Sequence, residues 1–165
     1  MQNSGQLIKY LKLGEEIEKK GIKFYSSALK RVDDPNSKGL LRFLITEEHN
    51  HLEYLMSFER IAKGRKNGAK IKKAKQPIFS KAAYKRIKGD RAITLNLFNT
   101  ALDIELRSAR LYSGIARKVN DKKIKAFMKK LVKWEIGHFR LIKAHQDAIY
   151  DYLYWEMRGQ ERIET

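Results

Sequence analysis

Apolar residues recur at intervals of three and four along four long segments of the chain, and polar or charged residues fill the positions between them. This spacing is typical of an α-helix with one buried face. The segments cover about residues 5–31, 36–62, 91–119 and 122–156. No segment alternates apolar and polar residues with a period of two, so we expect no β-sheet. The pattern predicts an all-α protein with four helices.

The first two segments are repeated in the last two. Residues 16–55 align without a gap on residues 103–142, at a constant offset of 87. Ten positions are identical, namely Ile17/Ile104, Glu18/Glu105, Tyr25/Tyr112, Ser26/Ser113, Val32/Val119, Asp34/Asp121, Lys38/Lys125, Leu44/Leu131, Glu48/Glu135 and His51/His138. In each copy a short polar break separates two apolar stripes, which predicts a helical hairpin. We therefore expect a four-helix bundle made of two duplicated hairpins.

A long basic segment joins the two predicted hairpins. Residues 62–88 contain eleven Lys or Arg and no acid. At roughly 3.3 Å per extended residue, such a segment can run the full length of a bundle, so the second hairpin can lie inverted against the first. We expect a single domain over residues 1–165, with hairpin one at about 5–62, the basic crossover at 63–90 and hairpin two at about 91–156.

The composition narrows the chemistry. The chain has no cysteine, which excludes disulfides, thiolate zinc sites, Cys-ligated iron–sulfur clusters and thiol nucleophiles, so a metal site must use Asp, Glu or His. No run of 18 apolar residues occurs, and the first residues lack an apolar signal stretch. We therefore expect a cytoplasmic protein with no membrane partner. The formal net charge of +17 makes a polyanion such as nucleic acid an alternative partner.

Two Glu-x-x-His motifs occupy equivalent positions in the two copies. Glu48 with His51, and Glu135 with His138, each place a carboxylate and an imidazole on one face near the middle of a helix. A repeated Glu, at positions 18 and 105, lies in the middle of the helix before each motif. Four buried carboxylates require compensating charge, which two divalent cations would supply. Ligands of this type without thiolate suit iron or manganese.

With these motifs the chain resembles the ferritin-like superfamily, and most closely the small rubrerythrin-type proteins that lack a rubredoxin domain. The resemblance covers about residues 5–150. It rests on Glu18-x-x-Gly21-x-x-Phe24-Tyr25, on Glu48-x-x-His51, on Glu105 seven residues before Tyr112, and on Glu135-x-x-His138. It implies a ferritin-like bundle that holds two iron ions, with manganese as the alternative metal.

The resemblance also implies a role for each residue. Glu48 and Glu135 would bridge the two metal ions, and the terminal ligands would be Glu18 with His51 and Glu105 with His138. Tyr25 and Tyr112 would hydrogen-bond ligand carboxylates and so support catalysis; the alternative is that both are core aromatics. Peroxidase-type rubrerythrins carry an additional Glu where this chain has Ser108, so the six-residue set is closer to that of bacterioferritin.

The function implied by the resemblance is that of a non-haem di-iron oxidoreductase of the peroxidase or ferroxidase type. Such a protein reacts with hydrogen peroxide or dioxygen in oxidative stress or iron handling. A separate electron donor must supply its electrons, because the chain has no cysteine-bound redox centre. Two alternatives stay open. One is a basic di-iron protein that binds nucleic acid weakly through the crossover, and the other is a structural bundle stabilised by its metal.

Several residues near the motifs fall outside the candidate set. His49 lies about 100° around the helix from the adjacent ligand, which predicts a surface position. We expect His145 to be packed or exposed rather than a ligand. Glu47 corresponds to Trp134 in the second copy and so breaks the symmetry of the set. The aromatic tail at 150–155 could cap the bundle, but we expect it to form a homodimer interface.

Overall fold

A computed structural model describes residues 4–64, 77 and 91–161. These residues form four α-helices and no strand. The helices are α1 (Ser4–Leu29), α2 (Pro35–Ala62), α4 (Arg91–Lys118) and α5 (Lys122–Glu161). The prediction of an all-α protein with four helices is confirmed. The predicted boundaries differ most at the ends of α1, which stops at Leu29 instead of 31, and of α5, which continues to Glu161 instead of 156.

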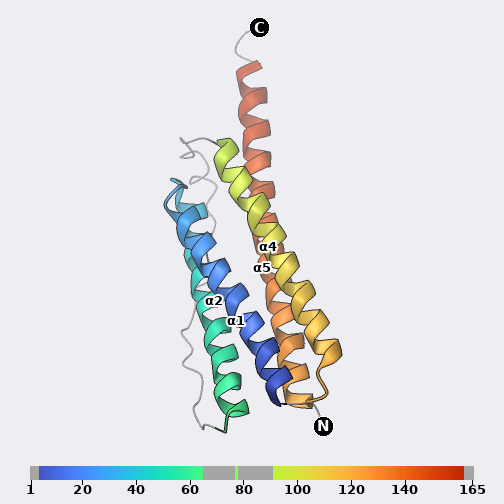
Figure 1. The fold of residues 1–165 in the computed structure, drawn as a ribbon. Helices are drawn as coiled ribbons and strands as arrows, with labels where there is room; N and C mark the ends of the chain where they lie inside the picture. The colour runs from blue at the N-terminus through green and yellow to red at the C-terminus, as the bar shows by residue number, and fades with distance from the viewer. Residues whose placement is uncertain (1–3, 65–76, 78–90, 162–165) are drawn as a thin grey trace.

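The four helices form a bundle of two hairpins. α1 packs along α2 and α4 packs along α5, and the hairpins meet through α1 on α4 and α2 on α5. In Figure 1 α1 and α4 run in opposite directions, so the second hairpin is inverted against the first. The predicted crossover lies outside the described residues except for Lys63, Gly64 and Pro77. The two helix ends that it joins lie at opposite ends of the bundle (Figure 1).

The second helix of each hairpin begins at an equivalent aspartate. The Ser37 backbone N–H donates to Asp34 Oδ1 at 2.8 Å, and the Ile124 N–H donates to Asp121 Oδ1 at 2.9 Å. Each carboxylate thereby satisfies a backbone donor that has no partner within its own helix. Pro35 follows the first of these caps and fits there, because its missing N–H is not needed at the start of a helix. The identical Asp pair of the repeat therefore fixes where α2 and α5 start.

Two apolar clusters fill the bundle on either side of its middle. Three repeat pairs divide between them, because Tyr25, Val32 and Leu44 belong to one cluster and Tyr112, Val119 and Leu131 belong to the other. The far ends of the opposite hairpin complete each cluster, for example Phe98 in the first and Leu11 in the second. The inverted duplication thus builds two similar cores and leaves a layer between them at the centre of all four helices.

The last helix extends beyond its neighbours. α5 has 40 residues, and its C-terminal part projects past the ends of the other three helices in Figure 1. Near its end, Arg91 Nη1 and Glu156 Oε2 lie 2.7 Å apart and tie it to the start of α4. Tyr154 and Trp155 are 54% and 72% exposed on the projecting part. None of the described helices contains a stretch long and apolar enough to cross a membrane.

The two caps give a test of the fold. We expect Asp34→Ala and Asp121→Ala each to lower the free energy of unfolding by about 1 kcal/mol, because each removes a capping acceptor. The loss should be larger at Asp34, which is 1% exposed and leaves a buried N–H unsatisfied. Urea denaturation followed by circular dichroism measures both. Asp33→Ala is the matched control at an exposed neighbour, and equal effects for all three variants would contradict the capping role.

Candidate metal centre

The six candidate ligands come from all four helices and meet in the layer between the two apolar clusters. α1 contributes Glu18 and α4 contributes Glu105, whereas α2 contributes Glu48 with His51 and α5 contributes Glu135 with His138. All six side chains are buried, and none is more than 5% exposed. A helix spacing of three residues puts the Glu and His of each motif on the same inward face. The bundle therefore brings together every residue that the repeat singles out for metal binding.

These side chains form two overlapping groups. Glu18, Glu48, His51 and Glu135 place one ligand atom each within 4.8 Å of one another. Glu48, Glu105, Glu135 and His138 do the same. Both groups contain Glu48 and Glu135, so these two carboxylates lie between the two positions. The remaining residues separate into a Glu18 and His51 pair and a Glu105 and His138 pair.

The imidazole orientations agree with this division. His51 Nδ1 lies 3.1 Å from Glu135 Oε1 and 3.6 Å from Glu18 Oε2. His138 Nδ1 lies 3.4 Å from Glu48 Oε1 and 3.5 Å from Glu105 Oε2. His51 Nδ1 also lies 3.8 Å from Glu48 Oε2. Each ring therefore turns the same nitrogen toward its unshared carboxylate and toward the shared carboxylates, of which His51 meets two and His138 one. Two equivalent half-sites follow from the inverted duplication.

Several of the inward atoms make no hydrogen bond within the described residues. They are Glu18 Oε2, Glu105 Oε2, Glu135 Oε1, both ring nitrogens of His51 and His138 Nδ1. Unsatisfied acceptors at this depth cost free energy, and their cost is removed when they coordinate a cation. All are oxygen or nitrogen donors, which suits a first-row divalent metal such as iron or manganese. The donor set fits a pair of such ions.

The pKa values of several groups in the cluster are raised, so these groups bind protons more strongly than they do in water. Burial acts to lower the pKa of His138, but the carboxylates of Glu105 and Glu48 outweigh burial and raise it to about 10. Burial raises the pKa of Glu18 well above its usual value, and repulsion from Glu48 raises it further. Burial and the charge of Glu48 raise the pKa of Glu135 in the same way. Divalent cations must displace these protons, so metal binding at the cluster releases protons.

Two tyrosines connect the hairpins through the ligand carboxylates. The Tyr25 hydroxyl, on α1, donates to Glu105 on α4, and the Tyr112 hydroxyl, on α4, donates to Glu18 on α1. Burial and the adjacent carboxylate, Glu105 for Tyr25 and Glu18 for Tyr112, raise the pKa of each phenol well above its usual value, so both stay neutral donors. Both rings also belong to the apolar clusters. Each tyrosine is therefore a core aromatic and a hydrogen-bond donor to a candidate ligand.

Aromatic rings surround the two imidazoles. The His51 ring stacks on Trp134 at a centroid distance of 4.9 Å and on His138 at 5.3 Å. Phe43 meets His138 edge-on at 6.2 Å. Gly21 of α1 lies against Glu48, since an added Cβ would be in ordinary van der Waals contact with the Glu48 carboxylate carbon at 3.6 Å. The ring contacts limit the rotation of the two imidazoles.

Glu47, which the repeat places outside the candidate set, lies close to two of the candidate ligands. Its carboxylate forms a third group with His51 and His138, with one ligand atom from each within 4.8 Å of the others. Unlike the six central residues, Glu47 is only half-buried. The signal for this position was present in the sequence, because Glu47 and His51 are four residues apart on one helix face. The comparison of the two copies did not indicate Glu47 as a ligand, because the equivalent residue in the second copy is Trp134.

The other histidines are not part of the centre. His49 is exposed, as its position on the helix predicts. His145 is fully buried and packed, because its Nε2 lies 2.9 Å from Ser37 Oγ and its ring meets Phe98 edge-on at 4.8 Å. Burial lowers the pKa of His145 to about 4. This histidine therefore supports the start of α2 as a neutral residue.

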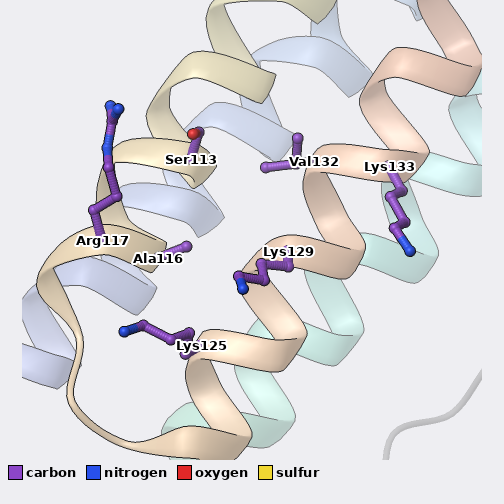
Figure 2. A pocket seen from close by; sticks show the side chains of 7 residues that line it. All are labelled: Ser113, Ala116, Arg117, Lys125, Lys129, Val132 and Lys133. Atoms are coloured by element: carbon purple, nitrogen blue, oxygen red, sulfur yellow. The ribbon is translucent and has the colours of Figure 1, made fainter.

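A basic groove lies on the outer face of α4 and α5, toward the turn between them (Figure 2). It has a volume of about 500 Å³, and an apolar floor that includes Ala116 and Val132. Its basic lining residues are Arg117, Lys125, Lys129 and Lys133, and no acid lines it. A second hollow on the same face shares Arg117 and adds Arg110. Part of the positive charge is therefore concentrated on the described surface of the second hairpin.

The sequence matches the Rubrerythrin family over residues 9–146, a range that contains all six candidate ligands. No curated protein matches the chain. The fold is similar to a solved structure described as CopM in the Cu(I)-bound form, with a TM-score of 0.60 and 10% identity over 87% of this chain and 96% of that chain. At this level of identity the similarity concerns the fold alone. The chain belongs to the rubrerythrin family of ferritin-like proteins.

Proposed function

We propose that this protein is a di-iron oxidoreductase that reduces hydrogen peroxide or dioxygen. Membership of the rubrerythrin family suggests di-iron chemistry in general. The observation that carries the proposal is the pair of overlapping ligand groups that share Glu48 and Glu135. A single structural ion would need only one such group. Two groups with two common carboxylates suit a pair of neighbouring ions that act together.

The ligand roles in this proposal follow the geometry. Glu48 and Glu135 would be shared by the two ions, Glu18 and His51 would complete one position, and Glu105 and His138 would complete the other, as the two overlapping groups suggest. Four carboxylates carry four negative charges, and two divalent cations balance them. Iron is the proposed metal and manganese the alternative, because oxygen and imidazole donors without thiolate suit both.

The remaining groups of the centre position the ligands and exclude water. Tyr25 and Tyr112 hold one oxygen of Glu105 and of Glu18, which limits the rotation of the unshared carboxylates. Trp134 and Phe43 cover the two imidazoles.

When bound, iron supplies the electrons that reduce the oxidant. A separate donor must then return electrons, since the chain has no cysteine for a redox centre of its own. We place this reaction in the cytoplasm, in oxidative stress or iron handling.

A second candidate function is polyanion binding. The sequence predicts weak nucleic-acid binding through the crossover at 63–90, which lies outside the described residues except for Lys63, Gly64 and Pro77. The groove on α4 and α5 gives this function a described location, because four basic side chains line it and no acid does. Basic side chains at such spacing neutralise phosphates along a nucleic-acid backbone.

Homodimerisation is a further part of the proposal. The projecting end of α5 exposes Tyr150, Tyr154, Trp155 and Met157, each at least 47% exposed. Exposed aromatics grouped on one segment are typical of protein interfaces. We propose that a second copy of the chain covers them.

The metal assignment is tested by elemental analysis of protein reconstituted with Fe(II) without oxygen and freed of excess metal. We expect two irons per chain in the wild type. Glu48→Gln and Glu135→Gln should each retain less than about one, because each variant removes a ligand from both positions and metal binding depends on the ligand count. Glu16→Gln is the control, since Glu16 is exposed two residues before Glu18. Two irons in both shared-carboxylate variants would contradict the assignment.

The same reconstituted protein tests the reaction. Wild-type protein should consume added hydrogen peroxide or dioxygen, and the two shared-carboxylate variants should not. Iron at two per chain without consumption of either oxidant would contradict the oxidoreductase proposal and favour the structural alternative.

Polyanion binding is tested with a fluorescent DNA duplex over a range of salt concentrations. Replacing Lys125, Lys129 and Lys133 by Ala should lower the slope of log affinity against log salt by about 2.7, at about 0.9 for each phosphate that is no longer neutralised. The control replaces the exposed Lys20, Lys23 and Lys30 of the first hairpin and removes the same charge. Equal reductions of the slope in both variants would mean that only the net charge matters.

The dimer is tested by sedimentation velocity. We expect wild-type protein to sediment at twice the 19.4 kDa chain mass, and the double variant Tyr154→Ser with Trp155→Ser to sediment as a monomer. Ile61→Ser is the matched control, because Ile61 is 57% exposed near the end of α2. A monomeric wild type, or a double variant that still dimerises, would remove the interface from the proposal.

A further inference from the structure

The two copies differ in the residue that immediately precedes the shared glutamate, next to the imidazoles. Where the first copy has Glu47, the second has Trp134. Trp134 stacks on His51, so it closes one side of the histidine pair with an apolar ring. Glu47 is half-buried and brings a carboxylate to the same histidine pair. Among the three described groups of possible ligands, every other residue is buried.

The geometry places Glu47 within reach of both histidines. One ligand atom each from Glu47, His51 and His138 lie within 4.8 Å of one another. Independently of Glu47, His51 is 1% exposed, and neither of its ring nitrogens makes a hydrogen bond within the described residues. Its Nδ1 lies 3.1 Å from Glu135 in the central layer, which leaves Nε2 as a second buried donor atom. A half-buried carboxylate and an unsatisfied imidazole therefore meet at the edge of the centre.

We propose that Glu47, His51 and His138 form a third divalent-cation site, which captures a cation from solvent and passes it to the buried pair. This inference rests on the proposed function, because it requires the central cluster to hold a metal pair. The site offers one carboxylate and two imidazoles, a set that divalent iron, cobalt and manganese accept.

The two histidines allow this site to hold a cation only transiently. A neutral imidazole has one nitrogen lone pair to donate, and Nδ1 of each ring faces the central carboxylates. Once both central positions are filled, the rings cannot also hold a third cation at the edge. The third site is therefore occupied only while the centre is incomplete, and the saturated protein holds two cations per chain.

The positive net charge of the chain explains why a cation needs a carboxylate at the point where it enters. A formal net charge of +17 repels an approaching cation and lowers its concentration near the surface. A carboxylate beside the buried ligands offsets this repulsion at the point where the cation must lose its water. Asn50 Nδ2 donates to Glu47 Oε1 at 3.1 Å, which steadies the carboxylate. The fully buried carboxylates behind it do not reach solvent and cannot make the first contact.

Co²⁺ is a suitable probe, since it needs no oxidant and quenches nearby tryptophan fluorescence. Trp134 reports on the site because its ring stacks on His51. Trp155→Phe serves as the background for every variant, because it removes the other tryptophan, which is 72% exposed. Stopped-flow mixing should show a fast phase that depends on Co²⁺ concentration, followed by a slower phase. Elemental analysis should give two Co²⁺ per chain at the end.

Glu47→Gln should lose the fast phase and take up Co²⁺ about tenfold more slowly, while its endpoint stays at two cations per chain. Glu16→Gln, an exposed acid on α1, is the matched control and should behave as the background. Unchanged rates in Glu47→Gln with two cations bound would overturn the capture site and leave the proposed function standing.

Three other outcomes are decisive. A lower endpoint in Glu47→Gln at an unchanged rate would overturn the inference and make Glu47 a positioning residue for the central pair. Three cations in the saturated background protein would overturn the role in passage. No Co²⁺ uptake in the background protein would overturn the proposed function itself, and the capture site with it.

Discussion

The interaction on which the rest of this structure depends is the burial of four carboxylates and two imidazoles in one layer of a helical bundle. Each isolated buried carboxylate would cost several kcal/mol, and neighbouring ones repel each other. The raised pKa values of Glu18, Glu135 and His138 show that without divalent cations the layer takes up protons. No arrangement of these groups in a dry interior is favourable without positive charge. Protons can supply that charge in the absence of metal, and the overlapping groups that share Glu48 and Glu135 place the same oxygen and nitrogen atoms where two cations could replace the protons.

The inverted duplication is what makes this arrangement possible. Within one hairpin, a Glu on the first helix and a Glu-x-x-His on the second give half of the ligands near the middle of the helices. Inverting the second hairpin keeps its middle at the same level, so the two halves face each other across one layer (Figure 1). The tyrosines make the halves interdependent, since Tyr25 of the first hairpin donates to Glu105 of the second and Tyr112 donates to Glu18 of the first. A hairpin alone would have neither a complete ligand set nor its supporting donors.

The sequence predicted the positions at which both copies of the repeat need the same side chain for the same structural reason. Asp34 and Asp121 were identical because each begins a helix, and Glu48 and Glu135 were identical at positions whose side chains face the same layer. Helical spacing of the apolar residues was enough to predict the four helices, because each has one buried face.

Features made by contacts between distant parts of the chain were not readable in this way. The contact of His145 with Ser37 joins residues 108 positions apart, and the basic groove forms only when α4 and α5 lie side by side. The place of Glu47 at the edge of the centre was missed for another reason. It occurs in one copy only, so a search for repeated residues discards it.

The difference between Glu47 and Trp134 makes the surroundings of the two imidazoles unequal. Glu47 already adds one carboxylate beyond the set that two cations balance, and a second at position 134 would increase this excess of negative charge. Trp134 instead stacks an aromatic ring on His51 at a centroid distance of 4.9 Å. Glu47 supplies a half-buried carboxylate beside the two histidines. Under the proposed function, the central residues are duplicated because two ions would need equivalent surroundings, whereas a cation would need only one approach to them. Symmetry is therefore kept where charge must balance and is lost one position away, where the centre meets solvent.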